Sequence, residues 1–122
     1  MMAVQIALSM GIDPLVADID PRRLEAAKAF GASRVFDSSD REQIKAIKKL
    51  SDGGVFAALD FVGAEVSTGF GLSCLRKGGR QVIVGLYGGA LNIPLPFIPM
   101  NARIIQDRIV LRSTDCFATN IN

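Results

Sequence analysis

The sequence has 122 residues, 49% of them hydrophobic, with a mean hydropathy of +0.31 and a formal net charge of +2. The length predicts one domain over residues 1–122, and the near-neutral charge with scattered basic residues argues against nucleic-acid binding. Because no apolar run reaches the ~20 residues of a membrane span and the N-terminus lacks the basic start of a signal peptide, we expect no membrane association and a cytoplasmic protein.

The N-terminal part of the chain predicts three helices and two short strands. In chain order, we expect a helix over 2–10, a strand over 15–19, a helix over 22–30, a strand over 34–36 and a helix over 41–50. Gly11 is expected to end the first helix. Asp20 is expected to cap the second, with Pro21 at its first position. Ser39 and Glu42 match a capping box for the third.

The rest of the chain predicts three more strands. We expect a strand over 55–63, a helix from 65 that is followed by a Gly-Gly turn at 78–79, a strand over 80–89, a short helix near 101–107 and a strand over 108–114. Strands that alternate with helices are the signature of βαβ units. The sequence therefore predicts an α/β fold with a mostly parallel, doubly wound sheet.

The first strand ends in an acid, Asp18. In a dinucleotide-binding fold, an acid at the end of the second strand accepts hydrogen bonds from the adenosine ribose hydroxyls, and it disfavours a 2′-phosphate. The alternative is a solvent-facing strand end or helix cap. Asp20 already supplies the cap, which favours ribose recognition. Arg22 and Arg23 either brace the adenosine ribose or phosphate, or form a solvated helix start.

Two further strands carry glycine at their carboxyl ends, at Val62-Gly63 and at Val84-Gly85-Leu86. Ligands of such sheets bind at the carboxyl ends of the strands. Glycine there lets a ring or another backbone approach closely, and ordinary turn chemistry explains the same residues equally well.

Histidine is absent, and the two cysteines, Cys74 and Cys116, form no Cys-x-x-Cys pair. Without histidine a Ser-His-Asp or Cys-His centre cannot exist within one chain. Neither zinc nor a redox dithiol is indicated.

Three segments closely resemble the medium-chain, zinc-type alcohol dehydrogenase family: VADIDPRRLEAAKAFGASRVFD, LDFVGAEVSTGFGLSCLRKGGRQVIVGLYGG and RIVLRST. The resemblance covers the chain to about Thr114. It implies the middle of a Rossmann-like, NAD-binding domain. Members of the family are more than twice this length and carry a separate catalytic domain that holds the zinc, so we expect no zinc in this chain.

The resemblance also implies a set of cofactor-binding residues. Asp18 matches the ribose-binding acid of the family, and Arg23 lies where a basic residue often flanks the ribose. Val62 and Gly63 match positions that line the cofactor, and Val84, Gly85 and Leu86 match the segment beside the nicotinamide.

In the family, a first strand and a turn of the form GxGGxG come before the helix that matches MMAVQIALSMG, and they hold the pyrophosphate. Neither is present in these 122 residues. We therefore expect a truncated domain that lacks the first strand and the Gly-rich turn, with weakened or lost NAD binding. That strand is central in the order 3-2-1-4-5-6. Its absence leaves two edges, which either accept a strand from another copy or pair directly. We expect a homo-oligomer, a dimer or larger, joined through sheet edges.

Two functions of different classes remain open. The first is an NAD(H)-binding module of an oxidoreductase family without a complete dehydrogenase site. The second is a cofactor-free oligomeric scaffold, with an acquired hydrolase-like activity that would depend on groups such as Asp18, Asp60, Thr68 or Ser73. A carboxylate with a raised pKa in an apolar pocket would indicate the second.

Overall fold

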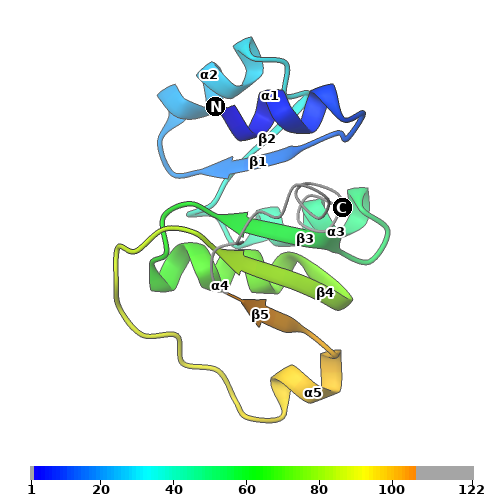
Figure 1. Cartoon of the computed structure of the whole chain (residues 1–122), viewed down its shortest axis with the longest axis vertical. Helices are drawn as coiled ribbons and strands as arrows, with labels where there is room; N and C mark the ends of the chain where they lie inside the picture. The colour runs from blue at the N-terminus through cyan, green and yellow to red at the C-terminus, as the bar shows by residue number, and fades with distance from the viewer. Residues whose placement is uncertain (1, 107–122) are drawn as a thin grey trace, which may run out of the picture. The chain divides into compact units, whose positions relative to one another are not determined.

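The computed structural model describes residues 2–106. The chain divides into two compact units, residues 1–43 and residues 44–122. The first holds α1 (Met2–Ser9), β1 (Leu15–Asp18), α2 (Pro21–Ala29) and β2 (Arg34–Asp37) (Figure 1). Helix α3 (Glu42–Leu50) begins at the boundary. The second holds β3 (Val55–Asp60), α4 (Glu65–Cys74), β4 (Leu75–Ile83), α5 (Phe97–Asn101) and β5 (Ile104–Gln106).

Local sequence signals mark the residues at which the helices of the first unit begin or end. Gly11, with φ of +76°, follows α1, and its N–H donates to the Leu8 carbonyl at 3.0 Å. Asp20 caps α2, because its Oδ1 accepts the Arg22 N–H at 2.9 Å, and Pro21 stands at the first helical position. Both predictions are confirmed. For α3, the N–H of Glu42 bonds to Asp40 Oδ1 at 3.0 Å, so Asp40 rather than Ser39 caps this helix start.

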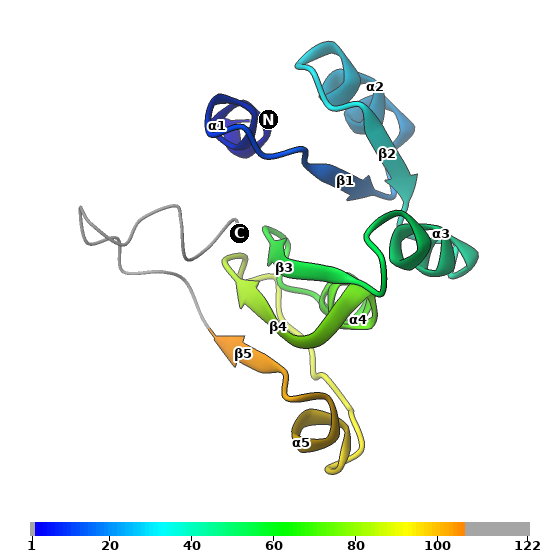
Figure 2. The same ribbon diagram turned by 90° about the vertical axis from the view of Figure 1, so that its right-hand side faces the viewer.

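The first unit has a two-stranded parallel sheet and a small core. Strands β1 and β2 pair in register from Leu15↔Arg34 to Asp18↔Asp37, and both helices lie beside them (Figure 2). The core consists of a few small and branched side chains from both helices, both strands and the turn after α2: Val4, Ala27 and Ala32, with Val16 and Val35 packed against them.

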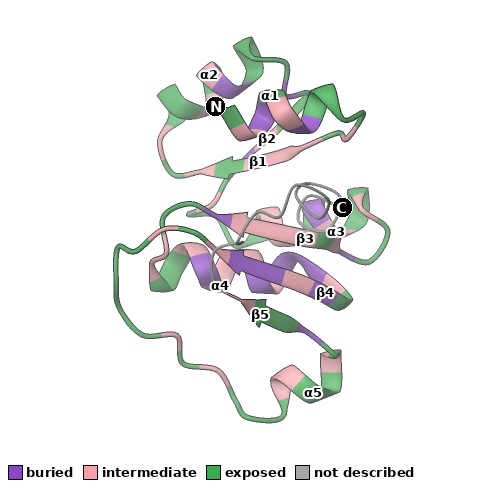
Figure 3. Cartoon of the chain, viewed as in Figure 1, coloured by how far each residue is buried: buried purple, intermediate pink, exposed green. Residues whose placement is uncertain are grey.

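The second unit has a larger parallel sheet, in the order β3-β4-β5. Helix α4 packs against β3 and β4. The most deeply buried side chains lie in α4 and β4 (Figure 3): Leu72, Leu75, Gln81 and Val82. The core of this unit therefore lies between one helix and the central strand.

Three sequence-based expectations for the second unit are wrong. Strand β4 begins at Leu75, because the chain pairs with Val55 there before a register shift leads to Arg80. It ends at Ile83, because the N–H groups of Val84 and Gly85 turn to the Asp60 carbonyl.

The segment expected to be a short helix near 101–107 instead contains the end of α5 and strand β5. Ala102 ends α5 in a left-handed conformation, with φ of +49°. The β-branched pair Ile104–Ile105 then extends along β4. The strand expected over 108–114 lies outside the described residues.

All strand pairs in the described residues are parallel, which confirms the mostly parallel, Rossmann-like α/β fold. Among the described residues, the first unit has the sheet β1-β2 and the second unit has the sheet β3-β4-β5. Within this range, β1 pairs only with β2, and β3 only with β4. No helix in the described part is long and apolar enough to cross a membrane.

Candidate functional site

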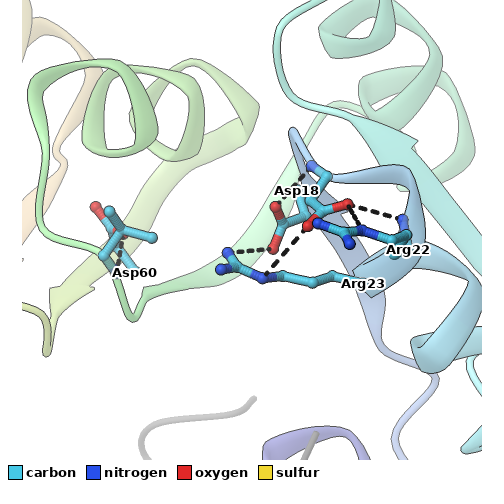
Figure 4. Close-up of polar contacts among 6 residues, drawn as sticks. Asp18, Arg22, Arg23 and Asp60 are labelled. Atoms are coloured by element: carbon cyan, nitrogen blue, oxygen red, sulfur yellow. Dashed lines mark hydrogen bonds and ion pairs between the residues drawn. The ribbon is translucent and has the colours of Figure 1, made fainter.

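Asp18, the last residue of β1, has one carboxylate oxygen committed to local structure and one directed at a cation. Oδ1 accepts the Asp20 N–H at 2.9 Å, which fixes the turn into α2. Oδ2 lies 3.6 Å from Arg23 Nη1 (Figure 4). The side chain is 25% exposed. Because a carboxylate has about four lone-pair sites, Asp18 retains capacity to accept hydroxyl groups. The residue therefore fits recognition of a ribose diol.

Arg22 and Arg23 fold back toward the acids of the β1–α2 turn. Arg22 Nε lies 3.5 Å from Asp20 Oδ1, and Arg23 Nε lies 4.0 Å from Asp20 Oδ2. Their side chains are 92% and 64% exposed. Both guanidinium groups thus remain open to solvent on the side away from the acids. Their two positive charges face the two negative charges of Asp18 and Asp20.

The structure brings a further acid to this edge that the sequence reasoning missed. Asp37 ends β2 and is the register partner of Asp18. Its Oδ1 accepts the backbone N–H of Ser39 at 2.9 Å and the Ser39 hydroxyl at 2.6 Å. These two bonds, the hydroxyl bond foremost, lower the pKa of Asp37. The signal was available, because RVFD ends in an acid as LVAD does.

In the second unit, Asp60 organises the loop that follows β3. Its side chain is buried, and Oδ1 accepts the N–H groups of Val62 at 3.0 Å and Gly63 at 3.1 Å. Oδ2 accepts the hydroxyls of Ser67 at 3.0 Å and Thr68 at 2.6 Å. With four donors on its two oxygens, Asp60 acts as a structural anchor between β3 and α4. The sequence had indicated it only as a possible acid for hydrolysis.

Gly63 and Gly85 allow two backbones to touch. A Cβ built on Gly63 would lie 1.9 Å from the Gly85 carbonyl oxygen, and a Cβ built on Gly85 would lie 2.3 Å from the Val62 carbonyl carbon. The structure displays both uses that were open for these glycines: Gly63 has a turn-type φ of +70°, and another backbone approaches closely at both positions. The space beside each α-carbon is filled by the chain itself.

The structure gathers five of the predicted residues at one end of the second unit: Val62, Gly63, Val84, Gly85 and Leu86. Backbone bonds join their loops, because Tyr87 N–H donates to the Val62 carbonyl at 3.1 Å and Gly88 N–H to the Gly63 carbonyl at 3.2 Å.

A pocket of about 130 Å³ lies beside these loops, lined by residues that include Gly63, Thr68, Ile83 and Gly88. The exposed side chain of Leu86 and the half-exposed Val62 give this end an apolar surface. Among the described residues that line the pocket, Glu65 at the start of α4 is the charged one.

The described residues do not fit a zinc ion. Within residues 2–106, no group of three or more His, Cys, Asp or Glu side chains is placed to hold a metal. Cys74 is a free, buried thiol, and burial raises its pKa to about 11, so it is a poor thiolate ligand at neutral pH.

Parallel strands with helices between them, an acid at one strand end and glycine loops at two others are the pattern of a Rossmann-like domain of the dinucleotide-binding class. The chain belongs to the zinc-binding dehydrogenase family, whose pattern matches residues 1–121. The resemblance to zinc-type, medium-chain alcohol dehydrogenases is thereby confirmed.

Individual relatives agree. The chain is 33% identical over 102 residues to an NAD-dependent alcohol dehydrogenase of Sulfurisphaera tokodaii, covering 82% of this chain and 29% of that protein. It is 34% identical over 104 residues to a sorbitol dehydrogenase of Bacillus subtilis, covering 83% and 30%. The solved alcohol dehydrogenase of Aeropyrum pernix superposes with a TM-score of 0.78 at 29% identity, covering 93% of this chain and 33% of that one. The chain thus spans about a third or less of the length of these relatives.

Proposed function

We propose that the chain is an NAD(H)-binding domain of an alcohol-dehydrogenase-type oxidoreductase. The observation that carries the proposal is Asp18, held by the Asp20 N–H at the end of β1 with its second oxygen turned to Arg23. A fixed, partly exposed carboxylate at this strand end suits a ribose diol. When bound, NAD supplies the hydride acceptor, and the protein supplies its binding and orientation.

Within this proposal the residues divide by unit. Asp18 accepts the adenosine ribose hydroxyls, and Arg23 flanks the ribose. In the second unit, Val62 and Gly63 line the cofactor, and Val84, Gly85 and Leu86 lie beside the nicotinamide. Asp60 holds the first of these loops in shape without touching the cofactor.

We further propose that this chain by itself binds NAD weakly and lacks a complete dehydrogenase site. The 122 residues contain no GxGGxG turn to supply backbone donors to a diphosphate. Charge-assisted hydrogen bonds contribute roughly 1.5–3 kcal/mol each, so their absence weakens binding strongly. Oxidation of an alcohol, as the names of the relatives suggest, then requires zinc-binding and substrate-binding residues from outside this chain.

The test is a titration of the full chain with NADH, followed by fluorescence and calorimetry. We expect saturable binding that Asp18→Ala weakens by about 10-fold or more, because one or two hydrogen bonds to a charged group are lost. Asp13→Ala is the matched control, since Asp13 is an acid of the same unit that bonds Ser33 at the other end of the strands. Absence of binding at millimolar NADH would contradict the proposal and favour the cofactor-free scaffold.

We also propose that the protein is cytoplasmic and forms a dimer or larger oligomer through a sheet edge. Support comes from β1 and β3, each of which has a single strand partner among residues 2–106. An unpaired strand edge is a template for pairing with another chain. Light scattering at micromolar concentration should give at least twice the monomer mass of 13.0 kDa. A monodisperse monomer would count against self-association.

A further inference from the structure

The carboxyl edge of the β1–β2 sheet carries two adjacent acids. Asp18 and Asp37 are register partners in the parallel ladder, so their side chains start on the same face, about 4.8 Å apart. The Ser38 N–H donates to the Asp18 carbonyl at 3.2 Å, which ties the two strand ends together. A ligand group bound at Asp18 therefore lies in the field of Asp37 as well.

Of these acids, only Asp18 is compensated by a cation. Arg23 Nη1 lies 3.6 Å from Asp18 Oδ2, and the remaining arginine of the turn, Arg22, pairs with Asp20. Asp37 has no ion pair among the described residues. Its hydrogen bonds come from Ser39, which stabilises the carboxylate without adding positive charge. The low pKa of Asp37 keeps it ionised at neutral pH.

We propose that Asp37 is a second specificity-determining residue for the cofactor, and that it opposes an adenosine ribose carrying a 2′-phosphate. The inference rests on the proposed NAD site at Asp18. Arg23 cancels much of the repulsion that Asp18 exerts, and an arginine near this position attracts a 2′-phosphate. The uncompensated charge of Asp37 restores the preference for a free hydroxyl. At a partly solvated surface, one carboxylate a strand spacing away should change the affinity for a phosphate by about three- to tenfold.

The experiment compares NAD⁺ and NADP⁺ binding to the ¹⁵N-labelled full chain through amide shifts of residues 18–23. The variants are Asp37→Asn and the matched control Asp13→Asn, which removes the same charge before β1, where Asp13 bonds Ser33. Asparagine keeps an oxygen that can accept both Ser39 bonds, so the turn is retained. The spectra themselves report whether each variant is folded. Asp37→Ser is a second variant that removes the same charge as Asp37→Asn.

We expect Asp37→Asn to raise NADP⁺ affinity by about three- to tenfold at low salt and NAD⁺ affinity by less than about twofold. At ~0.5 M salt the gain should shrink, because the Debye length falls to a few ångströms. Asp13→Asn should leave the ratio of the two affinities unchanged.

The outcomes separate this inference from the proposed function. If NAD⁺ shifts the amides but Asp37→Asn leaves the affinity ratio at its original value, or Asp13→Asn alters it equally, the role of Asp37 is overturned and the NAD site stands. If NAD⁺ produces no shifts in residues 18–23, the proposed function is overturned, and the role of Asp37 with it.

Discussion

At the scale of single residues, glycine decides the shape of the candidate site. Gly63 has φ of +70° and lies against the Gly85 carbonyl, with no room for a side chain. Gly69, on helix α4, has open space where a Cβ would be. The same residue type is therefore indispensable at one position and a weakness at the other, because glycine lowers helix stability when nothing requires it.

We expect Gly63→Ala to lower the free energy of unfolding by ~2–4 kcal/mol, since both the backbone conformation and the contact become unfavourable. Gly69→Ala, the matched control, should be neutral or raise it by up to ~1 kcal/mol. Urea unfolding followed by circular dichroism measures both. Similar free energies of unfolding for the two variants would show that the Val62–Gly63 loop can rearrange around a side chain without losing stability.

At the scale of secondary-structure elements, the contact between α4 and β4 contains an unpaired polar group. Gln81, in the centre of β4, is completely buried, and neither its Nε2 nor its Oε1 has a hydrogen-bond partner. Helix α4 presents Gly71 to it, where a Cβ would lie 2.6 Å from Gln81 Oε1. A buried polar group without a partner costs about 1–3 kcal/mol. The α4–β4 contact therefore stabilises the fold less than it would with an apolar side chain in place of Gln81.

Replacing Gln81 by methionine, which has a similar shape and no strong polar group, should raise the free energy of unfolding by ~1 kcal/mol. Gln5→Met on the exposed side of α1 is the control and should change it by less than ~0.5 kcal/mol. Chemical denaturation of the full chain provides the measurement. A loss of stability in Gln81→Met would show instead that the amide is hydrogen-bonded in solution.

At the scale of the whole molecule, the two units differ in the number of described strands and in the size of the buried side chains that stabilise them. The first has two strands and a core of small side chains, with Ala27 and Ala32 at its centre. Among the described residues, the second has three strands and the fully buried Leu72, Leu75 and Val82. A two-stranded sheet is marginal without further packing, so the unit that carries Asp18 should be the less stable of the two.

Amide hydrogen exchange on the full chain should reveal this difference. We expect the amides of β1 and β2 to exchange at least about 10-fold faster than those of β4, because local opening exposes them at lower free energy. Bound NAD⁺ should slow exchange in β1 if Asp18 contacts the ribose. Equal protection of β1 and β4 would indicate one cooperative structure rather than two units of unequal stability.

Much of the candidate site could be predicted, because its signals are local. Asp18 follows an apolar strand, and Asp20 with Pro21 starts a helix, whatever the rest of the chain does. Asp37 was equally visible at the end of RVFD, but its importance depends on its register with Asp18 and on the pairing of Arg23 elsewhere. Those facts depend on which strand lies beside which.

The sequence by itself determined the alternation of strands and helices, the cap of α2 and the acid at the first strand end, because each depends on neighbours within one turn or one strand. It also determined the family resemblance, because three long segments carry it. Only the tertiary structure decided that Asp60 anchors a loop, that Gly63 meets Gly85 and that Gln81 is buried unpaired. Thr68, which donates to Asp60 Oδ2 from helix α4, lies eight positions along the chain, and the pairs Gly63–Gly85 and Gly71–Gln81 are further apart still. The physical reason is that burial and close approach are properties of packed surfaces, which no local pattern of residues encodes.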